Sequence, residues 1–212
     1  MRIAFDHQIF CAQSFGGISR YFVNIANEIS LMGEDVGIFA PLHRNHYLET
    51  LPSYLVYGWG LRRYIPKTGR IMLFPNRLVA KPLIKKWAPD IVHETYYAKT
   101  SCVPFNTCRV LTVYDMIHER YPQWSSRWDH SASLKRLAVY RADHIICISN
   151  STRNDLLETY DIDPKKVSVV HLGSEIKSLG VSKEVSSVGQ RRPYLLYVGA
   201  RSGHKNFKGF IN

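Results

Sequence analysis

Long apolar runs are missing from this sequence of 212 residues. No apolar run approaches the roughly 18 residues that a membrane-spanning helix needs. Asp6 also lies where a secretory signal peptide would have its apolar segment. Hydrophobic residues nevertheless make up 45% of the chain, which is ordinary for a soluble globular protein. The sequence therefore predicts a folded, cytoplasmic protein.

Paired cysteines and clustered histidines are also missing. The cysteines are Cys11, Cys102, Cys108 and Cys147, none of which forms a C-x-x-C pair, and the histidines are scattered along the chain. A chain of this size does not need disulfides to fold, and a zinc site needs closely spaced ligands. We expect reduced, mostly buried thiols, no metal site and no bound cofactor.

Acidic residues are absent between Glu49 and Asp90, a stretch rich in Lys, Arg and large apolar residues, and the chain has a formal net charge of +11. Such an excess of positive charge favours an anionic partner, which could be nucleic acid, a phosphorylated ligand or an anionic membrane surface. No nucleic-acid reader motif is recognisable, and the charge is confined to one segment. We therefore rank a basic nucleic-acid-binding module low and expect no nucleic-acid partner.

Within this basic stretch, residues 70–87 are expected to be helical, although Pro75 and Pro82 would interrupt a regular helix. Arg77, Lys81 and Lys85 would share one face at four-residue spacing. We predict that these three cations contact an anionic membrane surface. The alternative is a solvated basic helix.

Short apolar runs alternate with helical patterns, which indicates an α/β protein with a Rossmann-like, doubly wound parallel sheet. We expect a helix after the first strand, another at residues 124–140, and Ser149 as the cap of a third. Pro41 should end the second strand. The six strands are expected at residues 3–5, 35–40, 89–93, 109–115, 142–148 and 167–170.

A glycine pair follows the first predicted strand. Gly16 and Gly17 precede a helix whose apolar residues Ile18, Phe22 and Ile25 recur at helical spacing. Glycines let the backbone approach a ligand closely, and the amides of a helix's first turn attract a phosphate or carboxylate. The pattern matches neither G-x-G-x-x-G nor a P-loop, so a tight connection without a ligand is the alternative.

Polar side chains also follow the third and fourth predicted strands. His93, Tyr96 and Tyr97 lie at the end of the third strand, and Asp115 and His118 lie at or after the end of the fourth. The carboxyl ends of parallel strands meet at one edge of the sheet, where open α/β sheets bind their ligands. These side chains should therefore converge with the glycine pair on one binding crevice.

Three regions are expected along the chain. Residues 1–172 should form one Rossmann-like domain, and residues 173–192, rich in Ser, Gly, Lys and Val, should form a linker. Residues 193–212 begin with a strand-like run that leads to Arg201 and Lys205. This last region predicts the first strand and loop of an incomplete second domain.

With these residues identified, the chain resembles the N-terminal half of a family 4 glycosyltransferase. This large group of retaining sugar transferases has two facing Rossmann-like domains, the GT-B fold. Four segments carry the resemblance in the family's order: Gly16-Gly17-Ile18 with Arg20-Tyr21; residues 110–122; residues 142–146 leading through Ser149 and Arg153 to Lys166, Val169 and Gly173; and Tyr197-Val198-Gly199 followed by Arg201, Lys205 and Asn206.

The resemblance implies roles for the donor-side residues. The amides of Gly16 and Gly17 would approach the diphosphate of a nucleotide sugar, and Arg201 and Lys205 would neutralise this leaving group without a metal ion. The alternative is that Arg201 and Lys205 are ordinary solvent-exposed residues of a loop.

On the acceptor side, Asp115 and His118 are the candidate catalytic residues, and His93, Tyr96 and Tyr97 the candidate acceptor-binding residues. Many relatives have a His-Asp pair where this chain has Tyr114-Asp115, so His118 is a candidate replacement. The family's glutamate pair would lie beyond Asn212.

The sequence thus predicts half of a retaining glycosyltransferase that transfers a sugar from a nucleotide sugar to a glycan or lipid-linked acceptor in cell-surface polysaccharide synthesis. We expect the 212 residues by themselves to be inactive, and the protein to be cytoplasmic or peripheral on the inner membrane face. A non-catalytic phosphate or nucleotide-sugar binding domain is the alternative.

Overall fold

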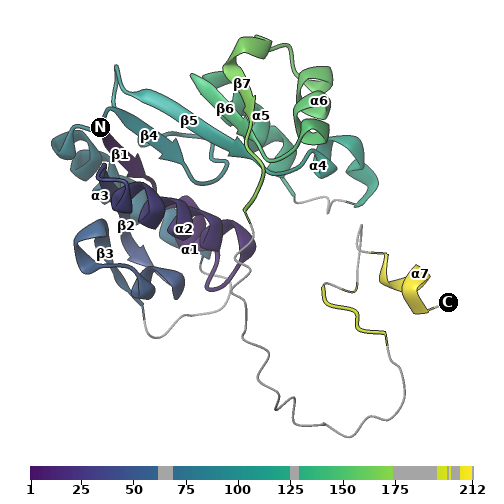
Figure 1. Ribbon diagram of the computed structural model, residues 1–212, viewed down its shortest axis with the longest axis horizontal. Coiled ribbons are helices and arrows are strands. Elements are labelled where there is room, and N and C mark those ends of the chain that lie inside the picture. Colours follow the sequence, from purple (N-terminus) through teal and green to yellow (C-terminus); the bar gives the residue numbers. More distant parts are fainter. Residues whose placement is uncertain (62–68, 125–128, 174–194, 200, 202–205, 212) are drawn as a thin grey trace, which may run out of the picture.

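The computed structural model describes residues 1–61, 69–124, 129–173, 195–199, 201 and 206–211. They contain a seven-stranded, wholly parallel sheet with the order β3-β2-β1-β4-β5-β6-β7 (Figure 1). The strands are β1 (Arg2–Phe5), β2 (Asp35–His43), β3 (Val56–Gly60), β4 (Ile91–Glu94), β5 (Cys108–Val113), β6 (His144–Cys147) and β7 (Val167–Val169).

Helical segments connect most of these parallel strands, whereas residues 95–107 between β4 and β5 contain no helix. The α-helices are α1 (Gln8–Ala12), α2 (Gly17–Leu31), α3 (Gly69–Trp87), α4 (Ile117–Arg120), α5 (Ser131–Arg141), α6 (Asn150–Thr159) and α7 (Phe207–Ile211). The short 3₁₀ helices are η1 (Tyr47–Thr50), η2 (Ser53–Leu55), η3 (Pro122–Trp124) and η4 (Pro164–Lys166). The Ser149 side chain accepts a hydrogen bond from the Thr152 amide, which confirms the cap predicted for α6.

Helices cover both faces of the sheet because successive side chains of a strand point to opposite sides. In β1, Ile3 and Phe5 pack with α2, which lies over β1 and β2 in Figure 1, whereas Ala4 packs with Ala80 and Ile84 of α3. A second core cluster joins β5, β6 and β7 to α5 and α6. The doubly wound α/β fold predicted from the sequence is confirmed.

Three proline positions differ from the sequence prediction. β2 continues through Pro41 to His43, and its register with β3 shifts between Phe39 and Leu42, which is an irregularity where a strand tolerates proline. α3 continues through Pro75 and Pro82. The packing of its inner face on the sheet outweighs the lost backbone hydrogen bonds.

The edge strand β3 is absent from the sequence prediction, because its residues lie in the stretch interpreted as a basic block. Gly58 permits its close approach to β2, since a Cβ there would lie 1.8 Å from the carbonyl oxygen of Ala40. α1, between β1 and the glycine pair, was also not predicted.

The C-terminal region forms no strand in its described part. Leu195–Gly199 are irregular, and Tyr197 packs with Phe207 and Phe210 of α7. The run expected as the first strand of a second domain therefore has no sheet partner among the described residues. Most of the predicted linker, and Pro193 and Tyr194, lie outside the described residues.

Candidate functional site

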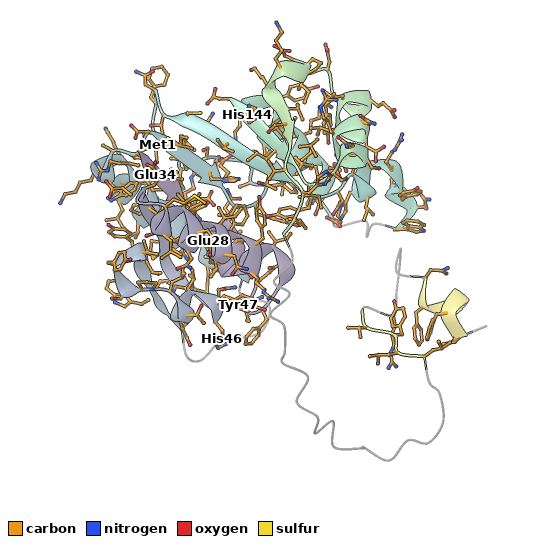
Figure 2. The ribbon with its side chains drawn as sticks, in the orientation of Figure 1. Met1, Glu28, Glu34, His46, Tyr47 and His144 are labelled. Atoms are coloured by element: carbon orange, nitrogen blue, oxygen red, sulfur yellow. The ribbon has the colours of Figure 1, made fainter. Side chains whose placement is uncertain are left out.

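The glycine loop lies at the carboxyl-end edge of the sheet and is held by the segment that follows β2. The Asn45 Nδ2 donates to the carbonyl of Gln13 at 2.8 Å, and the His46 amide donates to the carbonyl of Ser14 at 3.0 Å. The Phe15 ring stacks on the His46 ring with centroids 4.6 Å apart. Figure 2 shows His46 beside Tyr47, whose ring meets Phe15 edge-on. These contacts preorganise the loop before α2.

The two glycines have different surroundings. A Cβ on Gly16 would lie 2.1 Å from Gln13 Oε1, an atom that accepts a hydrogen bond from the Ser19 amide. A Cβ on Gly17 would meet no atom within 4 Å. Gly16 therefore serves the packing of the loop, whereas the space in front of Gly17, at the first residue of α2, is open to a ligand.

Asp6 joins the ends of β1 and β4. Its carboxylate is buried and accepts hydrogen bonds from the Thr95 amide at 2.9 Å, the Thr95 hydroxyl at 2.6 Å and the Gln8 Nε2 at 2.6 Å. Because these donors come from Thr95, directly after β4, and from Gln8 of α1, Asp6 aligns the ends of β1 and β4 beside the glycine loop.

Asp115 lies at the same edge, two residues beyond β5, and its side chain is 46% exposed. Its Oδ1 accepts from the Ile117 amide at 3.2 Å, and the Lys135 ammonium donates to its backbone carbonyl at 2.7 Å. The ammonium lies 3.8 Å from Oδ1. Asp115 is thus a carboxylate of defined position with an accessible face.

His118 and Asp115 have different partners, although both lie in the segment around the start of α4. The His118 Nε2 lies 3.2 Å from Asp129 Oδ2, whereas its Nδ1 is buried without a hydrogen-bond partner among the described residues. A hydrogen bond with the Ser131 side chain is the main cause that lowers the pKa of Asp129, and the nearby His118 lowers it further. An ionised Asp129 orients the His118 ring.

Tyr114 directly precedes Asp115, where the resemblance described above led us to expect a histidine. Its ring packs edge-on against Tyr21 with centroids 5.5 Å apart. Its hydroxyl is buried, and burial raises the pKa of the phenol. Tyr114 belongs to an aromatic cluster and cannot supply the acid-base chemistry of a histidine near neutral pH.

The predicted acceptor-binding residues divide between the core and the surface. His93 is buried, stacks on Phe5 and donates to or accepts from the Thr112 hydroxyl at 2.9 Å. Burial lowers its pKa to about 3, so the ring is neutral. Other side chains thus cover His93, and its assignment to acceptor binding stays a prediction.

Tyr97 is also buried, with the Lys135 ammonium 5.5 Å from its ring centroid. Tyr96 is half-buried, and the charges of Asp115 and Asp129 act on it, although burial is the larger cause of its raised pKa. Of the three predicted residues, Tyr96 is the one that is only half-buried, and it lies near Asp115.

A buried ion pair supports the end of β4. Arg141 Nε and Nη2 donate to the two carboxylate oxygens of Glu94 at 3.0 and 3.2 Å. Glu94 is fully buried, and burial raises its pKa while Arg141 opposes that rise. This fork links β4 to the end of α5 and positions the segment that carries Tyr96.

The cations predicted to contact the donor or a membrane differ in their exposure to solvent. Lys205 lies outside the described residues, and Arg201 is exposed with its guanidinium 5.2 Å from the Phe207 ring centroid. The described residues do not bring Arg201 to the glycine loop. On α3, Lys81 and Lys85 are exposed, but Arg77 is half-buried and its charge acts on His7 and Cys102.

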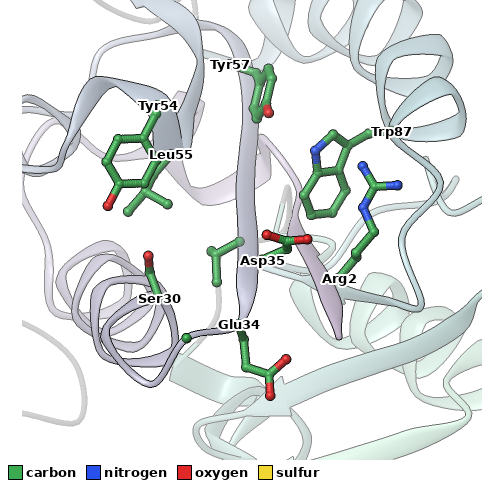
Figure 3. A pocket seen from close by; sticks show the side chains of 10 residues that line it. Arg2, Ser30, Glu34, Asp35, Tyr54, Leu55, Tyr57 and Trp87 are labelled. Atoms are coloured by element: carbon green, nitrogen blue, oxygen red, sulfur yellow. The ribbon is translucent and has the colours of Figure 1, made fainter.

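A hollow of about 390 Å³ lies at the opposite, amino-end edge of β1 and β2 (Figure 3). The Arg2 guanidinium stacks on the Trp87 ring there, 4.4 Å from the centroid, and Asp35 lies beside it. None of the predicted donor, catalytic or acceptor residues lines this hollow.

Two kinds of feature are absent from the part of the chain that the structure describes. No three or more His, Cys, Asp or Glu side chains gather there in a group that could hold a metal ion. None of the helices there is long and apolar enough to cross a membrane.

Comparison with known proteins identifies the family. Residues 15–177 match the family described as Glycosyltransferase Family 4. The chain belongs to glycosyltransferase family 4. The match contains Gly16, Gly17, Asp115, His118 and the Glu94–Arg141 ion pair.

Two known proteins give the extent of the similarity. The O-antigen chain mannosyltransferase RfbU of Salmonella typhimurium is 28% identical over 182 residues, which are 84% of this chain and 48% of that protein. A sucrose-phosphate synthase from Thermosynechococcus elongatus has a similar fold, with a TM-score of 0.59 and 17% identity over 82% of this chain and 48% of that one. The chain thus spans about half the length of these relatives.

Sequence reasoning missed the charged residues that hold the site together. Lys135 lies on the helix predicted at residues 124–140 and Arg141 directly follows it, and cations in such positions are most often solvated. Glu119 lies between this helix and the fourth predicted strand. Asp6 follows a predicted buried strand, and this position was the one sequence signal that could have assigned it to the site. The pairings depend on contacts between elements far apart in the sequence.

Proposed function

We propose that this chain is the acceptor-side half of a retaining glycosyltransferase that moves a sugar from a nucleotide sugar to a glycan or lipid-linked acceptor in cell-surface polysaccharide synthesis. Membership of glycosyltransferase family 4, with an O-antigen chain mannosyltransferase among its relatives, carries this proposal. The convergence of the glycine loop, Tyr96 and Asp115 on one edge of the sheet supports it.

For the donor, the open space at Gly17 and the first-turn amides of α2 suit a diphosphate. The amides and the positive end of the helix dipole attract the anion without a side chain. In the proposed reaction Arg201 and Lys205, facing this edge from a second domain, neutralise the leaving diphosphate, so that no metal ion is needed.

For the acceptor, the accessible face of Asp115 accepts a hydrogen bond from a sugar hydroxyl, and Tyr96 provides a half-buried ring beside it. The bond between the anomeric carbon and the diphosphate oxygen breaks as the acceptor oxygen bonds to the same face of that carbon. The proton of the acceptor hydroxyl passes to a diphosphate oxygen. His118, whose ring is held by Asp129, provides a second polar side chain to this acceptor site.

A transfer assay with the protein that carries both domains tests the proposal. Labelled nucleotide sugars, including an activated mannose, are offered with a lipid-linked saccharide, and NMR reads the anomeric configuration of the product. We expect retention, with Asp115→Asn reducing turnover and the exposed Asp161→Asn as a matched control. Inverted configuration, or the absence of transfer to any saccharide acceptor, would contradict the proposed function.

A further inference from the structure

The outer face of α3 is apolar, although its inner face already packs on the sheet. Asn76, Ala80 and Ile84 are buried, while Phe74 and Leu78, four residues apart, are 66% and 60% exposed. Pro75, Val79, Pro82 and Leu83 are exposed as well. A helix that faced only water would be polar on this side, and contiguous exposed apolar groups mark a contact surface.

A cationic groove adjoins the C-terminal half of this helix. It has a volume of about 650 Å³ and lies between α3 and the segment that enters β5. Its three charged side chains are Lys81, Lys85 and Arg109, and no acidic residue lines it. The Phe105 side chain, at the same groove, is 94% exposed. The remaining lining residues are Ala88, Pro89, Val103, Pro104 and Thr107.

The groove is built around a fixed cation. Arg109 donates through Nη1 to the carbonyl of Arg141 at 2.7 Å, whereas its Nε is buried without a hydrogen-bond partner among the described residues. Lys81 and Lys85 follow each other by one helical turn on the opposite wall. A phosphate group between the walls would meet three positive charges. The Asp143 carboxylate accepts from the Arg109 amide at 2.8 Å and does not line the groove.

Cations beside exposed apolar side chains match one type of partner. We propose that α3 and Phe105 form a docking surface for an anionic phospholipid bilayer, with a lipid phosphate in the groove and Phe74, Leu78 and Phe105 among the acyl chains. A nucleic acid would contact the cations but leave Phe74 and Leu78 in water. The absence of acidic residues from 50–89 keeps the α3 side of this surface free of repulsion.

This surface differs from the cation set predicted from the sequence, because Arg77 turns inward and Arg109 takes part. The groove adjoins the amino end of β5, whereas the glycine loop and Asp115 lie at the carboxyl-end edge. A bilayer on α3 would therefore leave the proposed sugar site open. The inference rests on the proposed function for its purpose, since a lipid-linked acceptor lies at a membrane, but the contact is testable without any sugar.

Vesicle sedimentation with the purified chain tests the surface. We expect binding to vesicles of phosphatidylcholine with phosphatidylglycerol, weaker binding in high salt, and little binding to phosphatidylcholine alone. Lys81→Gln with Lys85→Gln should lower partitioning about 25-fold, since each cation near an anionic leaflet is worth roughly fivefold. Phe74→Gln with Leu78→Gln should lower it at least about tenfold.

Matched controls distinguish this surface from general stickiness. Lys165→Gln with Lys166→Gln, and Leu31→Gln with Met32→Gln, change exposed cations and exposed apolar residues elsewhere, and should bind vesicles as the unchanged chain does. Circular dichroism of each variant confirms folding. Equal binding to neutral vesicles, equal losses in the controls, or displacement of the chain from vesicles by nucleic acid would overturn the inference.

Depth of insertion gives an independent readout. In Phe105→Trp, brominated lipids should quench the added fluorescence, whereas in Phe15→Trp, at the glycine loop, they should not; equal quenching of both would overturn the inference. Vesicle binding with no sugar transfer in the earlier assay would contradict the proposed function alone. Sugar transfer without vesicle binding would contradict the docking surface alone.

Discussion

The ammonium of Lys135 lies 2.8 Å from Glu119 Oε2, and the two side chains are 1% and 6% exposed. The second oxygen of Glu119 accepts from the Tyr160 hydroxyl at 3.0 Å. The same ammonium donates to the carbonyl of Asp115. This buried pair therefore connects α4, α5 and the end of α6, and holds the segment that carries the candidate catalytic aspartate.

Lys135→Met should destabilise the fold by about 3–5 kcal/mol, because it leaves the Glu119 carboxylate buried without a cation. Adding Glu119→Gln should recover part of that loss, since the amide needs no counter-charge. Urea unfolding of both variants measures the effect, with the exposed Lys99→Met as control. A loss below about 1 kcal/mol would show that the pair is not tightly buried in solution.

Stability should fall as the pH drops below 6.5, because burial lowers the pKa of His93 from 6.5 to about 3. In this window the unfolded chain binds a proton that the folded chain does not, so stability decreases by up to about 1.4 kcal/mol per pH unit. His93→Gln should flatten the slope, measured by urea unfolding between pH 7 and 5. The exposed His171→Gln is the control, and an unchanged slope in His93→Gln would refute the assignment.

The two glycines should respond differently to a side chain. Gly16→Ala forces Gln13 away from the Ser19 amide and should cost about 0.5–2 kcal/mol of stability, as the loss of a helix cap does. Gly17→Val has room to fold normally but should reduce sugar transfer, because the branched side chain holds the phosphate off the helix amides. Thermal melts and the transfer assay separate the effects. Undiminished sugar transfer by Gly17→Val would contradict the proposed binding of the diphosphate at this position.

Lys205→Ala should lower turnover roughly 10²-fold or more in the protein with both domains, as expected when one preorganised charge at a leaving group is removed. Lys208→Ala, in α7, provides the nearby control. Initial rates at saturating nucleotide sugar measure the change. Equal effects of the two variants would mean that Lys205 has no special role.

The 212-residue chain should bind a nucleoside diphosphate no more tightly than the millimolar range, about −4 kcal/mol. The reason is that the proposed base and ribose contacts come from the second domain. Calorimetry with several nucleoside diphosphates provides the measurement. Micromolar binding would mean that this domain has its own nucleotide site.

Periodicity along the chain determined most of the sheet. The apolar runs that became β1, β4, β5, β6 and β7 are short, follow turn residues and alternate with helical patterns, so local signals agree with the fold. The positions of Gly16, Gly17 and Asp115 after strands likewise followed from their order in a parallel sheet. The resemblance to glycosyltransferase family 4 was also carried by residues in sequence order.

Tertiary packing decided the elements that contradict local preference. α3 passes through Pro75 and Pro82 because Ala80 and Ile84 pack against the sheet, and that gain depends on residues of β1 and β4. β2 passes through Pro41 because β3 pairs beyond it after a register shift. No local window contains these partners.

Packing also decided which polar residues belong to the site. Strand alternation put His93 on one face, but the rings of Phe5 and Phe22 exclude it from the surface. Lys135 appeared as a surface cation of a helix, yet Glu119 and the carbonyl of Asp115 compensate its burial. Sequence order determines which side chains reach an edge of the sheet, whereas burial depends on the side chains that distant segments pack around them.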